Sequence, residues 1–188
     1  MNVKFRKKWL IDKAKRNWFW IVSTAIVIAG MILIPMFINE NKHAVEEAAK
    51  AFQNKRLKSD NNIQGISIFL PQGFKIESEE GNNKNNNFII SKGSQKYIVY
   101  INPLEKKTSK LLYENVLNSG DNFIINKTFI DKERFGFMLS EKKDKKIELS
   151  IGVGGFKMTT KTTRANITAD ARNMMGIVNS IEILDTKK

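Results

Sequence analysis

The sequence predicts an α+β protein with one amino-terminal transmembrane helix and a small antiparallel-sheet domain that has helices packed on one face. Three observations support this fold class. Residues 18–38 form a run without a charged side chain. From residue 63 onward, apolar and polar residues alternate over short stretches, as they do in half-buried strands. Two segments of helical periodicity, 108–119 and 168–179, interrupt these strands, and this order is typical of a sheet with helices on one side.

The run 18–38 is long enough to cross a lipid bilayer. Its 21 residues would form a helix of roughly 31 Å, against about 30 Å for the hydrocarbon core. Trp18 and Trp20 lie where an aromatic belt meets the headgroups, and Phe37 occupies the equivalent place at the other end. Pro35 is tolerated in a membrane helix and is expected to kink its outer end. The bilayer is therefore the first partner that the sequence predicts.

Basic residues before the run predict its orientation. The first 17 residues contain one acid, Asp12, whereas the residues just after the run are close to neutral. Positively charged side chains next to a membrane helix remain on the cytoplasmic side. The amino terminus is therefore expected inside the cell and the carboxyl-terminal domain outside, in a single-pass protein of the cell membrane. The residues that set this topology are Lys4, Arg6, Lys7, Lys8, Lys13, Lys15 and Arg16.

Two other interpretations of the run fit the sequence less well. A cleaved signal peptide has a shorter apolar region, followed by a small-residue cleavage site. Here the run is longer and is followed by Ile-Asn-Glu-Asn-Lys, which favours an uncleaved anchor. A helix buried in a soluble protein is the other alternative, but a chain of 188 residues has little protein with which to surround a helix that is apolar on every side.

Residues after the anchor predict a helical stalk and then a separate domain. Residues 40–58 are rich in helix formers and lack glycine and proline. The expected boundary lies near Ser59, and residues 60–188 are expected to fold without the anchor. The predicted parts are a basic cytoplasmic stub 1–17, a transmembrane helix 18–38, a helical stalk 39–60 and an extracytoplasmic α+β domain 61–188.

The domain is expected to begin with strands. A polar, asparagine-rich loop over 79–87 precedes a hairpin, which turns at Lys92-Gly93-Ser94. Thr108 or Ser109 caps the first helix, and glycines 152, 154 and 155 loosen the chain before the second helix. The predicted strands are 66–70, 75–77, 88–91, 95–101, 122–130, 134–141, 146–153 and 180–184.

Several short patterns lie within 63–185: Pro71-x-Gly73-Phe74, the strand and turn from Tyr97 to Pro103, Ser109-Lys-Leu-Leu-Tyr113, and the ending Met174–Leu184 with Asn179-Ser180-Ile181. Together these patterns resemble the PsbP/Mog1-like α/β fold of bacterial envelope proteins. The resemblance implies a role in binding or assembly, because that fold is mostly non-catalytic, and it carries over no active site.

The composition excludes several classes of function. The net charge is +13, of which the cytoplasmic stub supplies +6 and the mixed outer part +7. Aromatic residues are not grouped with the basic ones into a stacking platform, so nucleic-acid binding is not expected. The absence of cysteine excludes disulfides, thiolate metal sites and a lipoprotein anchor. The excess of lysine over arginine and the many asparagines indicate an AT-rich genome, as in low-GC Gram-positive bacteria.

No catalytic, cofactor-binding or metal-binding constellation is predicted. The one histidine, His43, falls in the predicted stalk, so a Ser-His pair and a histidine zinc site are not expected in the domain. Glu77 and the two following glutamates flank the asparagine-rich loop, where solvation is the simpler interpretation. The Gly152–Gly155 segment lacks the helix and the Gly-Lys-Ser/Thr of a phosphate loop. Serine and lysine are both plentiful, so the composition leaves a serine–lysine dyad open, but no spacing indicates one.

These observations predict a protein-binding module on the outer surface of the membrane. An accessory or assembly subunit of a cell-envelope machine for secretion or conjugation is the first hypothesis. The alternative is a membrane-held immunity protein that neutralises a toxin acting outside the cell. A sensor is disfavoured because the cytoplasmic stub is too short for an output domain. Ala25 and Ala29 form a small-xxx-small pair that is compatible with homo-oligomers.

Overall fold

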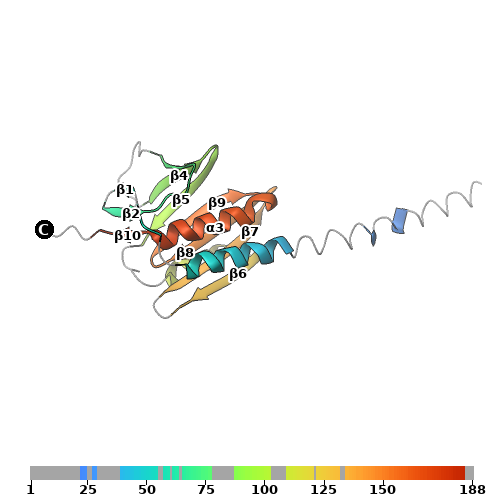
Figure 1. The fold of residues 1–188 in the computed structure, drawn as a ribbon. Helices are drawn as coiled ribbons and strands as arrows, with labels where there is room; N and C mark the ends of the chain where they lie inside the picture. The colour runs from blue at the N-terminus through green and yellow to red at the C-terminus, as the bar shows by residue number, and fades with distance from the viewer. Residues whose placement is uncertain are drawn as a thin grey trace, which may run out of the picture. The chain divides into compact units, whose positions relative to one another are not determined.

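The computed structural model divides the chain into two units, Met1–Asn39 and Glu40–Lys188. The residues that it describes are 22–24, 27–28, 39–54, 57–59, 61–63, 65–77, 87–102, 109–120, 122–131 and 134–184. Helices and antiparallel strands make up the second unit (Figure 1). The predicted α+β class is therefore confirmed.

A seven-stranded antiparallel sheet forms the centre of the domain. Its strand order is β3-β4-β5-β9-β8-β7-β6, and every neighbouring pair is antiparallel. The bounds are β3 Phe74–Ile76, β4 Asn87–Lys92, β5 Gln95–Ile101, β6 Phe123–Ile130, β7 Phe135–Lys143, β8 Lys146–Val153 and β9 Phe156–Thr162. The strands β1 (Asn61–Ile63), β2 (Ile66–Ile68) and β10 (Glu182–Ile183) form a second, smaller sheet in the order β1-β2-β10.

The strand β9 lies in the middle of the large sheet, although the sequence did not predict it. Gly154 and Gly155 have φ angles of 56° and 85°, the left-handed conformation that a two-residue hairpin turn requires. The turn pairs Val153 directly with Phe156. These glycines therefore reverse the chain into a further strand, whereas the sequence pattern alone predicts only an irregular segment after 146–153.

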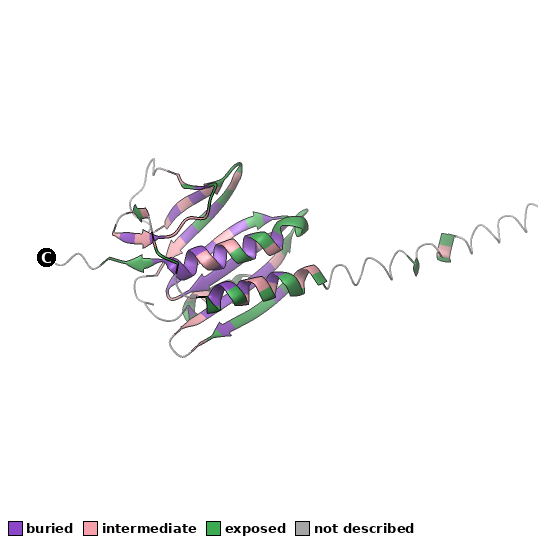
Figure 2. Cartoon of the chain, in the orientation of Figure 1, coloured by how far each residue is buried: buried purple, intermediate pink, exposed green. Residues whose placement is uncertain are grey.

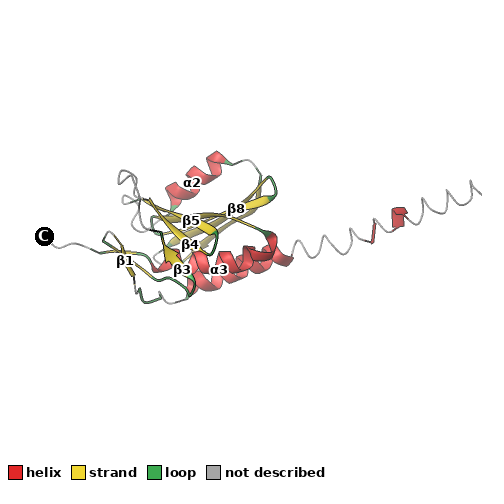
Figure 3. Cartoon of the chain, turned by 90° about the horizontal axis from the view of Figure 1, so that it is seen from above, coloured by secondary structure: helices red, strands yellow, loops and turns green. Residues whose placement is uncertain are grey.

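The helices cover both faces of the sheet, so the prediction of helices on one face was wrong. The helix α2 (Lys110–Ser119) places the Tyr113 ring 5.6 Å from Phe137 and 6.0 Å from Phe135. The intervening residue Gly136 points to the opposite face, where an added Cβ would lie 2.9 Å from Phe52. Side chains on both faces of β7 are apolar and buried, and each face needs its own cover. Figure 3 shows α2 and α3 on opposite sides of the sheet.

The main core lies between the sheet and two helices. One is α3 (Arg164–Ser180), which contacts β8 and β9 and begins four residues earlier than predicted. The other is formed by residues 39–53 and is called helix 39–53 here. Figure 2 shows buried residues along the central strands and in α3.

Helix 39–53 covers most of the predicted stalk, yet it contributes to the core of the domain. Ala44, Ala48 and Phe52 are buried on its inner side, at 0%, 0% and 2% exposure. The Asn179 side-chain amide donates to the carbonyls of Ala51 and Phe52, at 3.2 and 3.3 Å. These carbonyls near the carboxyl end of the helix thereby gain partners that the helix itself does not supply.

The predicted membrane segment 18–38 lies almost entirely outside the described residues. Residues 22–24 and 27–28 are helical, and Val22, Val27 and Ile28 are exposed. Within the part of the chain that the structure describes, no helix is both long and apolar enough to span a membrane. The interface residues Trp18, Trp20, Pro35 and Phe37 and the seven topology-setting bases lie outside that part.

Candidate functional site

The face of the sheet that carries α2 is exposed over β5, β9 and the start of β8. Side chains alternate along each strand. Those of β9, the start of β8 and residues 75–100 that share this side with Ile98 are called the open face here. Ile98 itself is 39% exposed. The members of the open face are Lys75, Glu77, Ile89, Ser91, Lys96, Ile98, Tyr100, Lys146, Glu148, Lys157, Thr159 and Lys161.

Strand register arranges the centre of the open face in two rows. In one row Ile98 pairs with Ile89 on one side and with Thr159 on the other. This row therefore presents two apolar side chains and one hydroxyl group. In the next row Lys161 pairs with Glu148. Because Tyr97 pairs with Thr160, the side chain of Lys96 lies across from that of Lys161.

The open face is basic, since it carries five lysines and two glutamates. Lys96 Nζ lies 3.1 Å from Glu77 Oε2 in an exposed ion pair, which is worth little in solvent. Lys157 Nζ sits 4.4 Å above the Tyr100 ring. Burial lowers the pKa of the Lys157 ammonium, and the charge of Glu148 opposes this effect.

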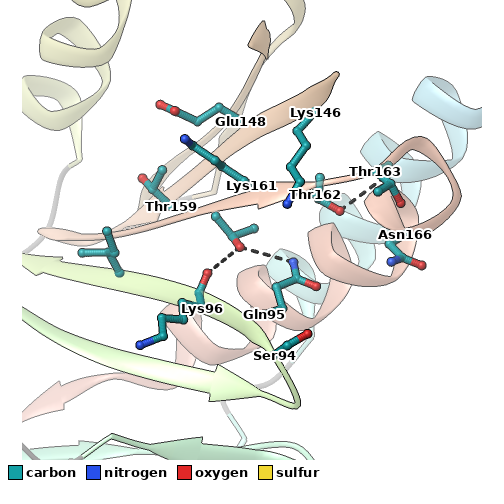
Figure 4. Close-up of a pocket in the computed structure, with 12 residues that line it drawn as sticks. Ser94, Gln95, Lys96, Lys146, Glu148, Thr159, Lys161, Thr162, Thr163 and Asn166 are labelled. Atoms are coloured by element: carbon teal, nitrogen blue, oxygen red, sulfur yellow. Dashed lines mark hydrogen bonds between the residues drawn. The ribbon is translucent and has the colours of Figure 1, made fainter. Parts of the chain in front are cut away.

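A groove of about 440 Å³ opens at the end where β5 and β9 separate. Figure 4 shows Lys146, Glu148 and Lys161 on neighbouring strands along this groove. The residues that line it are Ser94, Gln95, Lys96, Ile98, Lys146, Glu148, Thr159, Thr160, Lys161, Thr162, Thr163 and Asn166.

A buried carboxylate of α3 holds the floor of the groove together. Asp170 is 4% exposed and accepts hydrogen bonds from the Tyr97 hydroxyl at 2.8 Å and from the Gln95 amide at 2.9 Å. The Thr162 hydroxyl donates to the same carboxylate, and the Thr160 hydroxyl accepts from Gln95 at 3.2 Å. The network therefore ties β5, β9 and α3 together where the two strands part.

The Tyr97 phenol supplies a pH-dependent prediction. Burial, together with the hydrogen bond to Asp170, raises the pKa of Tyr97 above its usual value of about 10. A folded-state pKa that is raised contributes stability below the unfolded pKa, and this contribution is lost as the pH rises. We expect the melting temperature to fall above about pH 10, and to fall less steeply in Tyr97→Phe. Circular dichroism melts across alkaline pH test this, and equal slopes in the two proteins would contradict it.

The structure places the residues that the sequence analysis considered for chemistry in separate locations. His43 is exposed on helix 39–53, 3.5 Å from Glu46, and Glu77 pairs with Lys96 on the open face. Gly154 and Gly155 make the β8–β9 turn. In the described ranges, no cluster of three or more His, Asp or Glu side chains is arranged to hold a metal ion.

The lysines of the groove were not predicted as a site. Their signal in the sequence is the spacing Lys157-x-Thr159-x-Lys161, in which every second residue is polar. It was hidden because β9 was not predicted, and without β9 the lysines of β5 and β8 have no common neighbour. Among the aromatic side chains of the sheet, Tyr97 and Phe137 are fully buried.

The sequence matches no protein-family model and no curated protein. The PsbP/Mog1-like resemblance therefore stays a prediction. Two of its residues have clear structural roles: Asn179 holds the end of helix 39–53, and Ser180 accepts the backbone N–H of Phe69 at 3.0 Å.

Proposed function

We propose that this protein is a single-pass membrane protein whose outer domain binds another protein through the open face, as an accessory or assembly subunit of a cell-envelope machine. The observation that carries the proposal is the exposed centre of the sheet. An exposed isoleucine, Ile98, lies there among lysines. A partly apolar patch with a charged rim is the usual composition of a protein interface.

The predicted anchor adds a physical reason for a binding role. A membrane helix confines the domain to a thin layer next to other membrane proteins, which raises the effective concentration of each for the other. A weak interface is then sufficient for stable association. The proposal takes its orientation from the basic residues 4–16 and its binding surface from the second unit.

Photo-crosslinking in the native membrane tests the proposal. A photoreactive residue placed at Ile98 of the full chain is expected to give discrete adducts with envelope proteins, identified by mass spectrometry. Ile124 on β6 is a matched control, because it is also an isoleucine on a strand and is 41% exposed. Adducts from Ile98 that are absent from Ile124 would place the partner on the open face.

The other outcomes distinguish the alternative function or contradict the proposed binding surface. Capture of a single secreted toxin at Ile98 would establish the alternative, an immunity protein. Equal adduct patterns at Ile98 and Ile124, or no adducts at either, would contradict binding through the open face.

A further inference from the structure

We infer that the groove on the open face binds an extended, carboxylate-rich segment of the partner protein. The inference rests on the proposed function and names the chemistry of the partner. It is supported by the charge of the groove, the spacing of its lysines and its apolar residue Ile98.

The charge of the groove is unbalanced toward the basic side. Lys96, Lys146 and Lys161 line it together with one acid, Glu148. Lys96 is already paired with Glu77, and the Asp170 carboxylate is buried beneath the lining, where it accepts from Gln95 and Thr162. Among the described residues, neither Lys146 nor Lys161 has a carboxylate oxygen within 4.0 Å. Two ammonium groups are therefore available to a ligand, and carboxylates are their complementary partners.

The spacing of the lysines favours an extended chain over a single small anion. The three lysines come from three adjacent strands, in the order β5, β9, β8, and neighbouring strands lie about 4.8 Å apart. Figure 4 shows the ammonium groups of these three lysines apart from one another and not converging on one point. An extended segment that crosses the strands presents several carboxylates in a row and can meet them in turn.

The polar and apolar lining of the groove also fits a peptide. Ile98 lines the groove and is exposed. It can contact an apolar side chain of a peptide, whereas a free phosphate ion has no apolar group to place there. Thr159, Thr163 and Asn166 supply hydroxyl and amide groups for backbone hydrogen bonds of the ligand.

The test uses the full chain in uncharged detergent micelles and a short fluorescein-labelled peptide of alternating glutamate and valine. A peptide with glutamine in place of glutamate is its matched control. Fluorescence anisotropy should show binding of the glutamate peptide, weakening as salt is added, and little binding of the glutamine peptide. The double variant Lys146→Gln/Lys161→Gln should weaken binding about tenfold.

A second double variant, Lys110→Gln/Lys127→Gln, removes the same charge from α2 and β6, outside the groove. It should bind the glutamate peptide within about twofold of the unchanged protein, because remote surface charges are screened. Equal losses in the two double variants would show a net-charge effect and would overturn the inference. Melting curves confirm that both variants fold, since all four lysines are exposed.

For vesicle flotation the chain begins at residue 40, the start of the second unit, because the predicted anchor would float with any vesicle. If Lys146→Gln/Lys161→Gln in this chain loses binding to phosphatidylglycerol vesicles but keeps peptide affinity, the groove is a lipid-headgroup site and the inference is overturned. If Ile98 crosslinks to a partner but the variant keeps full affinity for both partner and peptide, only the acidic-segment inference fails. If Ile98 gives no adduct, the proposed function fails independently of the peptide result.

Discussion

A domain that begins at residue 61 is expected to lose its cooperative unfolding transition, whereas one that begins at residue 40 retains it. Helix 39–53 fills the core with Ala44, Ala48 and Phe52, and its removal would expose this side of the sheet to water. Replacing a buried phenylalanine by alanine alone costs about 3–5 kcal/mol, against a total stability of about 5–15 kcal/mol. The prediction from the sequence is that residues 60–188 fold alone, whereas the buried side of helix 39–53 leads us to expect that they do not.

Circular dichroism melts of the two truncated chains provide the measurement. Phe52→Ala and Gln53→Ala in the longer chain form a matched pair, since Phe52 is buried beside Phe129, with ring centroids 5.7 Å apart, and Gln53 is exposed. Phe52→Ala should lower the melting temperature strongly and Gln53→Ala hardly at all. A sharp transition in the chain from residue 61, at an unchanged temperature, would show that the helix is a separate stalk after all.

The second large effect is expected from Asp170→Ala. The substitution removes the acceptor of three side-chain donors, from Tyr97, Gln95 and Thr162. Hydrogen bonds to a charged acceptor contribute about 1.5–3 kcal/mol each. We therefore expect a loss of about 3 kcal/mol or more, because the three neutral donors lose their acceptor without regaining water. Urea unfolding followed by circular dichroism measures the loss.

Two further variants show whether the loss arises from the network. Arg172→Ala changes an exposed residue of the same helix that makes a long, 3.9 Å ion pair with Glu47, and it should shift stability by less than about 1 kcal/mol. Tyr97→Phe combined with Asp170→Ala should destabilise by less than the sum of the single changes, because the two side chains share one hydrogen bond. Additive effects would contradict the proposed coupling between β5 and α3.

Several elements of the fold were predictable because their signals are local. The hairpin of β4 and β5 was predicted from alternation around a glycine turn, and the structure pairs Lys92 with Gln95 across that turn. The helices α2 and α3 were predicted from periodicity, with boundaries that differ by a few residues. Each of these patterns is complete within about ten to twenty residues, which is the range over which periodicity operates.

The candidate site could not be predicted in the same way. Lys96, Lys146 and Lys161 are separated by up to 65 positions in the sequence, and each alone reads as an ordinary solvated strand residue. They become neighbours only through the order β5-β9-β8. That order depends on the strand that follows the glycine turn.

The sequence by itself determined the α+β class and the strands and helices whose periodicity is strong, and it is the source of the predicted membrane segment and its orientation. The tertiary structure alone decided that helix 39–53 belongs to the core, that helices cover both faces of the sheet and that three lysines line one groove. The physical reason is that composition and periodicity act between near neighbours. Burial, strand order and the meeting of charges depend on contacts between distant residues, such as the hydrogen bond from Asn179 to the carbonyl of Ala51.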